Sequence, residues 1–243
     1  MATRRGVDWL GLGLFGSLAA GTFGLGSWQV KRYFWKVDLV EERRRMLERD
    51  AVPLAEASRP YERVRCSGTF DYAQSMFVGP RSAPAHGVQG TGAMQPSGWY
   101  VVTPFTDKDS GKRVLVNRGW IPRDQQQLAL QGLEKGLDAE SFDGVLAKAE
   151  EGGTFTPDKL SNESVEYFRM DVETMRAQRG LPENTPLVER VQTSPQEATI
   201  MPRPKAPEDM MVFQVHPMTH VGYAATWYGL SAAGLFLIRK RFL

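Results

Sequence analysis

The sequence is poor in the residues from which most enzyme and metal sites are built. It has one cysteine, Cys66, and three histidines, His86, His216 and His220. One cysteine excludes an intramolecular disulfide, a CxxC redox motif and a four-cysteine zinc site, and three histidines leave few ligands for a metalloenzyme. The sequence also lacks a GxSxG motif and a glycine-rich phosphate loop, and no pair of nucleophile and base stands out. We therefore expect a protein that is not an enzyme.

A large excess of charge of either sign is absent as well. The 243 residues carry a net charge of +2. The first 40 residues contribute +3 and the last 24 another +3, so residues 41–219 carry −4. A mildly acidic middle segment is a poor match for a phosphate backbone, so we expect no nucleic acid among the partners. The basic ends are typical of flanks that orient a protein in a lipid bilayer.

Charged residues are missing altogether from two long stretches, the first of which lies near the N-terminus. Residues 9–30 contain no charge, and a helix of this length is about 33 Å long, enough to cross a bilayer core. We predict a retained transmembrane helix over residues 7–30. A cleaved signal peptide is the alternative, although its apolar region would be shorter.

The segment after this first helix is predicted to emerge from the membrane as a helix. Trp28, Gln29, Arg32 and Trp35 follow one another at helical spacing and are interpreted as interfacial anchors, with contact to a partner protein as the alternative. Residues 31–60 are therefore expected to form an emerging helix followed by a linker.

The second uncharged stretch runs from Met210 to Ile238. Pro217 suits the first turn of a helix, because its missing N–H would have no partner there. Trp227 lies towards one end of the stretch and a basic cluster closes the other, as interfacial anchors do. We predict a second transmembrane helix over residues 217–238 and a basic tail over residues 239–243, with a buried core helix as the alternative.

Both predicted helices carry small residues four positions apart, which allow two helices to approach closely. We predict that the two helices pair through these stripes. The stripes are Gly16, Ala20 and Gly24, then Gly13, Ser17 and Gly21, and in the second helix Ala225, Gly229 and Ala233.

Between the helices, residues 61–216 alternate short β-type segments with turn residues, which indicates a strand-rich soluble domain. A short helix is expected over residues 171–180, with Asp171 as its N-cap and Gly180 as its stop. Residues 193–209 contain four prolines and are interpreted as an extended linker. The predicted strands are residues 61–70, 76–79, 98–106, 113–121, 142–148 and 187–193. The predicted fold is thus a membrane-anchored α+β protein in which two transmembrane helices flank a barrel-like domain.

Four strings occur in a distinctive order along the chain. They are GSWQVKRYFWK at residues 26–36, VTPF at 102–105, VLVNRGWIP at 114–122 and HVGYAATWYGLSAA at 220–233. Together they resemble the surfeit locus protein 1 family. The resemblance spans about residue 20 to residue 243.

The resemblance implies an assembly factor for cytochrome c oxidase (complex IV), which assists maturation of the largest oxidase subunit around the insertion of haem a. The implied partners are cytochrome c oxidase subunit 1, other complex IV subunits and the lipid bilayer. The implied location is the mitochondrial inner membrane, crossed twice, with the soluble domain in the intermembrane space; a bacterial plasma membrane is the alternative. The alternative function is a stoichiometric structural subunit of the mature oxidase.

His220 is the candidate haem ligand. It lies at the start of the second helix, and Tyr223 and Trp227 follow it on the same helical face. A neutral imidazole is a good axial ligand for haem iron, and the resemblance also points to this histidine. The alternative is a polar interfacial residue bonded to lipid headgroups or to the soluble domain.

Two further groups are weaker candidates. Arg118 follows a strand in the string NRGW and could pair with a haem propionate, since its guanidinium matches planar oxyanions; the alternative is a structural ion pair within the domain. The methionines and histidines between Met210 and His220 include ligand types that suit Cu(I), but methionines are more often apolar filling.

Overall fold

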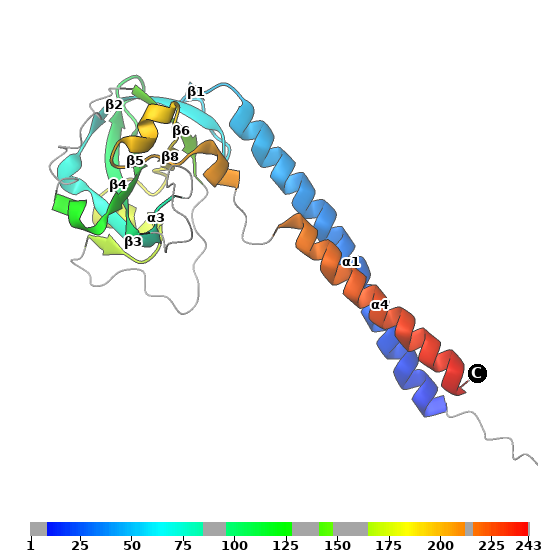
Figure 1. Ribbon diagram of the computed structural model, residues 1–243. Coiled ribbons are helices and arrows are strands. Elements are labelled where there is room, and N and C mark those ends of the chain that lie inside the picture. The colour runs from blue at the N-terminus through cyan, green and yellow to red at the C-terminus, as the bar shows by residue number, and fades with distance from the viewer. Residues whose placement is uncertain (1–8, 85–95, 128–140, 148–164, 212–215, 243) are drawn as a thin grey trace, which may run out of the picture. The chain divides into compact units, whose positions relative to one another are not determined.

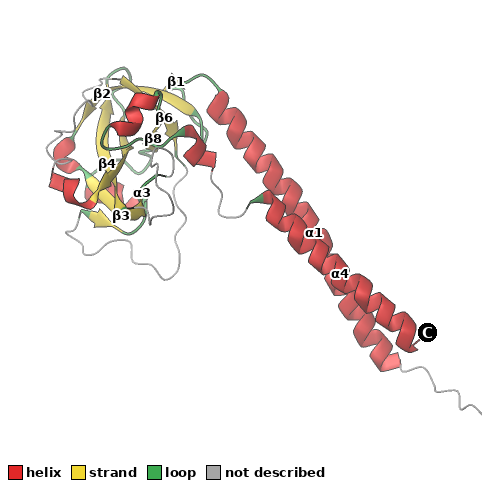
Figure 2. Cartoon of the chain, viewed as in Figure 1, coloured by secondary structure: helices red, strands yellow, loops and turns green. Residues whose placement is uncertain are grey.

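A computed structural model of the chain describes residues 9–84, 96–127, 141–147, 165–211 and 216–242 (Figures 1 and 2). The chain divides into two compact units. One contains residues 1–42 and 213–243 and is helical, and the other contains residues 43–212 and is rich in strands.

The strand-rich unit is a closed five-stranded barrel (Figure 1). Its strands follow the order β2, β6, β8, β5, β4, and β4 pairs again with β2 to complete the ring. Among the strand pairs of this ring, β5 and β8 are parallel and the others are antiparallel. The bounds are β2 (Arg63–Phe70), β4 (Ser97–Asp107), β5 (Arg113–Pro122), β6 (Ser141–Leu146) and β8 (Leu187–Arg190). Closure pairs both edges of the sheet, so the ring has no free edge strand.

Short elements extend and cover the barrel. They are β1 (Val52–Pro53), η1 (Tyr72–Gln74), β3 (Met76–Ser82), η2 (Arg123–Gln125), β7 (Glu166–Tyr167), α3 (Val172–Gln178), η3 (Pro195–Thr199) and η4 (Pro207–Met211). All six predicted strands are present, with ends that shift by a few residues, and the predicted short helix is α3 with Asp171 as its N-cap. The predicted membrane-anchored strand-rich fold is confirmed, and its barrel is closed.

The barrel has an inner and an outer core, because residues two apart on a strand share a face. Val114 and Val116 of β5 and Val188 of β8 belong to the inner cluster. The alternate residues Leu115 and Leu187 instead pack outside, against β3, β7 and α3. The alternation of residues along β5 and β8 therefore separates two hydrophobic layers.

The predicted proline-rich linker is wrong, because this segment packs on the barrel. Arg203 exchanges two backbone hydrogen bonds of 2.8 Å with Trp120 of β5. Pro202 and Pro204, which have no N–H to donate, alternate with Arg203 and are buried. Gly119 has φ of +133°, and a Cβ there would lie 2.1 Å from the Arg203 carbonyl oxygen. Glycine is thus required where these two backbones meet.

The helical unit consists of α1 (Trp9–Glu48) and α4 (Pro217–Phe242). Both helices are long and apolar enough to cross a membrane. The α1 helix has 40 residues and continues without a break beyond the predicted span of residues 7–30. Its last residues, from Arg43 onward, belong to the barrel unit. There the Arg43 guanidinium donates to Tyr61 Oη and to the Met210 carbonyl oxygen, at 2.6 and 3.1 Å.

The two helices of this unit pair, but not through the predicted stripes. Gly13, Gly16, Gly21, Gly24 and Gly229 have open space where a Cβ would stand. The contacts are made by a neighbouring face of each helix instead. Those contacts are between Ala19 and Gly234, between Ala19 and Ser231, and between Gly26 and Tyr228. The predicted pairing faces were therefore wrong. On each helix the face that makes the contacts is rotated from the predicted face by about a quarter of a turn or more, since successive residues are about 100° apart around a helix.

Candidate functional site

The site begins with His220, in the first turn of α4. Its Nδ1 lies 2.8 Å from Oε1 of Gln29 on α1. A side-chain carbonyl oxygen only accepts hydrogen bonds, so Nδ1 carries the hydrogen and donates it. In a neutral imidazole the other nitrogen, Nε2, then has the lone pair. The structure thus presents His220 as a potential ligand through Nε2.

Further polar contacts fix how α4 lies against α1. The Tyr228 and Ser27 hydroxyls are 3.1 Å apart, and Ser231 Oγ donates to the Ala19 carbonyl oxygen at 2.8 Å. Ser231 is buried between the helices. Because these contacts are spread along the pair, they define one register of α4 on α1, and that register sets the position of His220 opposite Gln29.

Gly26 allows the closest part of this contact. A Cβ at residue 26 would lie 2.8 Å from two ring carbons of Tyr228. The Tyr228 ring also packs against Phe23, with 5.3 Å between the ring centroids. The absence of a side chain at Gly26 therefore seats the Tyr228 ring between two turns of α1.

Tyr223 and Trp227 lie on the flank of the same contact face. Tyr223 is 52% exposed, and both Trp227 and His220 are half-buried. Spacings of three and seven residues place all three side chains along one side of α4. The structure thus arranges one imidazole and two aromatic side chains along one apolar edge, as the sequence predicts, but it adds Gln29, which the sequence suggested only as an interfacial anchor.

The donor set suits a single axial ligand. Within the described residues, no group of three or more His, Cys, Asp or Glu could hold a metal ion. Met210 packs with Val145 and Val191 in a barrel cluster, which indicates apolar filling for this methionine. A haem would need only one imidazole from the protein, which His220 would supply, and the apolar helix edge beside it would contact the macrocycle. His220 with its flanking rings fits that requirement.

Arg118 lies inside the barrel and is 1% exposed. Its guanidinium carbon is 4.6 Å from the ring centroid of Tyr72 and 5.2 Å from that of Phe70. It would have to become exposed before it could reach a propionate. The propionate role stays a prediction.

Arg190 is a second buried arginine and is not among the site residues predicted from the sequence. It is 4% exposed and pairs with Glu197 through a contact of 3.4 Å. Burial lowers the pKa of the Arg190 guanidinium, and the nearby Glu197 partly opposes that effect. Its position in the sequence could have indicated this burial, because Arg190 follows Val188 by two residues and therefore lies on the same inner face of β8.

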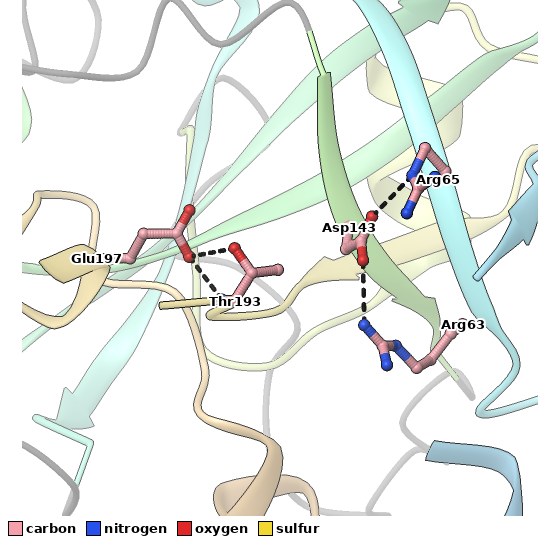
Figure 3. A network of polar contacts seen from close by, with 5 residues as sticks. All are labelled: Arg63, Arg65, Asp143, Thr193 and Glu197. Atoms are coloured by element: carbon pink, nitrogen blue, oxygen red, sulfur yellow. Dashed lines mark hydrogen bonds and ion pairs between the residues drawn. The ribbon is translucent and has the colours of Figure 1, made fainter. Parts of the chain in front are cut away.

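Two other groups have structural roles. On β6, Asp143 accepts from Arg63 at 3.0 Å and from Arg65 at 3.2 Å on the adjacent strand β2 (Figure 3). Such partly exposed pairs contribute about 1 kcal/mol or less. Cys66 is fully buried, and burial raises the pKa of its thiol to about 12. At neutral pH it is therefore a neutral core residue rather than a nucleophile.

The chain is similar in sequence to one protein family and to several known proteins. The SURF1 family model matches residues 17–232. Surfeit locus protein 1 of Arabidopsis thaliana is 30% identical over 98% of this chain and 79% of its own length. The SURF1-like protein of Drosophila melanogaster is 32% identical over 90% of the chain and 73% of its own length. Surfeit locus protein 1 of Homo sapiens is 30% identical over 91% of the chain and 74% of its own length.

Proposed function

Because this chain belongs to the SURF1 family, we propose that it is a membrane-anchored assembly factor for cytochrome c oxidase. It assists maturation of the largest oxidase subunit, subunit 1, around the step at which haem a is inserted. The family membership supports the general role. The observation that supports haem handling is the hydrogen bond from His220 Nδ1 to Gln29, which leaves Nε2 as a ligand on an apolar helix pair.

The residues divide the task in this proposal. His220 holds haem a through Nε2, Gln29 fixes the orientation of the imidazole, and Trp227 and Tyr223 cover the adjacent helix edge. When bound, haem a supplies the redox-active iron that the oxidase requires. A single protein ligand on a helix edge gives a complex that can release its cargo, which suits a carrier better than a permanent cofactor site.

We also propose that the chain crosses the mitochondrial inner membrane twice, with the barrel in the intermembrane space. The apolar helices α1 and α4 support a membrane protein. The bacterial plasma membrane, with the barrel in the periplasm, is the other compartment in which the same arrangement would function.

Affinity purification of the tagged full chain from gently solubilised membranes tests the function. We expect cytochrome c oxidase subunit 1 and early complex IV intermediates to copurify, in amounts well below the mature enzyme. Recovery at equal abundance with the mature oxidase would instead identify a structural subunit.

Haem analysis of the same preparation tests the ligand. We expect haem a in the wild-type preparation and its loss from His220→Ala, with subunit 1 still recovered. His216→Ala is the matched control, because His216 is exposed just before α4. An unchanged haem spectrum in His220→Ala would show that direct ligation by this histidine is wrong.

A further inference from the structure

We infer that Gln29 is a positioning residue that selects the ligating tautomer of His220. The inference rests on the proposed haem site and deepens it, since it assigns a role to a residue on the other helix. Its starting point is the 2.8 Å contact between Gln29 Oε1 and His220 Nδ1, which joins residues 191 positions apart. The rest follows from what this contact does to the imidazole.

A histidine can bind iron only through a nitrogen that carries no hydrogen. Which nitrogen that is depends on the hydrogen bond made by the other one. Here the acceptor is a carboxamide oxygen at Nδ1, so the hydrogen is held at Nδ1 and the lone pair at Nε2. Histidine ligands in metalloproteins are oriented in the same way by an outer acceptor.

The surroundings make this acceptor hard to replace. His220 is half-buried against α1, and Ala224, one turn further along α4, is 5% exposed. Nδ1 faces the contact with α1, and the Gln29 oxygen is the acceptor that lies against it, so loss of that oxygen leaves the ring without that acceptor. The imidazole is then free to change tautomer and to rotate.

The packing of α1 against α4 fixes where Gln29 lies relative to the His220 ring. Gln29, Ser27 and Ala19 of α1 contact His220, Tyr228 and Ser231 of α4 in antiparallel order. The Ser231 and Tyr228 contacts hold the register, and Gln29 uses that register to orient one ring. The role of Gln29 can thus be tested separately from that of Ser27. Replacing Ser27 weakens the pairing of the helices, whereas replacing Gln29 removes the acceptor of the His220 Nδ1 hydrogen.

The experiment uses the full chain labelled with ¹⁵N in lipid nanodiscs, first without haem. Long-range ¹H–¹⁵N spectra report which ring nitrogen of His220 is protonated. We expect a single Nδ1–H tautomer in the wild type and in Ser27→Ala, and a mixture of tautomers in Gln29→Leu. Gln29→Glu keeps an acceptor oxygen and should restore the Nδ1–H tautomer.

Titration with haem a then follows for the same variants. We expect Gln29→Leu to weaken binding about 10- to 100-fold, the usual effect of removing an outer acceptor, and Gln29→Glu to recover most of it. An unchanged tautomer and unchanged affinity in Gln29→Leu, with haem binding still lost in His220→Ala, would overturn this inference alone. Unchanged binding in His220→Ala would overturn the haem ligation itself, and with it the role of Gln29.

Discussion

Asp171 shows how one side chain organises a helix that covers the barrel. Its carboxylate accepts from the backbone N–H and the hydroxyl of Thr174, at 3.2 and 2.8 Å. The helix that begins here buries Val172 and Met175 in the outer core. The N-cap therefore stabilises both the first turn of α3 and the packing beneath it.

Replacing Asp171 tests that role. Asp171→Ala should destabilise α3 by about 1 kcal/mol, the usual effect of losing an N-cap. Hydrogen exchange of the α3 amides measures the change directly, because local opening of this helix exposes them. Asp171→Asn is the matched control, since asparagine keeps an acceptor oxygen and should retain most of the protection.

The same carboxylate should give a pH dependence. Burial by itself raises the pKa of Asp171, but the hydrogen bonds from Thr174 and the charge of Arg169 outweigh it and hold that pKa below its ordinary value. A lowered folded-state pKa stabilises the fold at pH values above the unfolded-state pKa, and this contribution is lost as the pH falls through the folded-state value. The α3 amides should be more protected from hydrogen exchange in the wild type than in Asp171→Asn, and this difference should shrink below about pH 4. A difference that stays constant as the pH falls would contradict a lowered pKa of Asp171.

At the scale of elements, Gly26 forms one of the close contacts between α1 and α4. A side chain at Gly26 would meet the Tyr228 ring at 2.8 Å, whereas nothing lies within 4 Å of the Cβ position of Gly24. Both glycines are in the same helix, two residues apart, so substitutions at them change helix propensity equally. They differ only in what the new side chain meets.

Gly26→Val should therefore separate the helices, and Gly24→Val should not. An engineered cysteine pair at Ala19 and Gly234 reports the separation, since the Cβ atoms there would be 3.3 Å apart, close to the spacing of a disulfide. We expect efficient cross-linking in the parent and in Gly24→Val, and several-fold less in Gly26→Val, consistent with the sensitivity of helix pairs to small-residue contacts. Equal cross-linking in all three would show that the pair does not rely on Gly26.

The elements also show what the sequence could predict. The strands of the barrel were predictable because short β-type runs bounded by turn residues mark strands locally, as in β4 and β5 on either side of their connecting turn. The proline-rich segment was misjudged because its partner, Trp120, is about 80 positions away in the chain. The prediction of the pairing faces of α1 and α4 was wrong for a related reason. Small residues are abundant on several sides of α1, and contacts between the helices, such as that of Ser231 with Ala19, determine which side faces α4.

The candidate site was predictable only in part. His220, Tyr223 and Trp227 are close in sequence, so helical spacing alone relates them. Gln29 is related to His220 only by the packing of two helices, and no local pattern indicates it. Arg190 could have been suspected from its register with Val188, but its burial depends on barrel closure.

At the scale of the whole molecule, one apolar helix precedes the barrel in the sequence and another follows it. A backbone that crosses a bilayer must satisfy its own hydrogen bonds, which a helix does. In the proposed arrangement, two crossings would put both chain ends on one side of the membrane and the barrel on the other. Arg239, Lys240 and Arg241 favour the cytoplasmic or matrix side for the C-terminus, whereas Lys31, Arg32 and Lys36 oppose that orientation.

Because these clusters compete, neutralising one of them should shift the orientation. Replacing Arg239, Lys240 and Arg241 with glutamine should yield a mixed population, in which a C-terminal tag becomes accessible to protease in sealed mitoplasts or spheroplasts. The wild type should show both terminal tags protected and the barrel cleaved. Replacing Lys108, Lys112 and Arg113 on the barrel removes the same charge and should change nothing, since folded domains contribute little to orientation. Protection of one terminal tag but not the other in the wild type would contradict two crossings, and with them the placement of the barrel and the helix pair on which the His220 site depends.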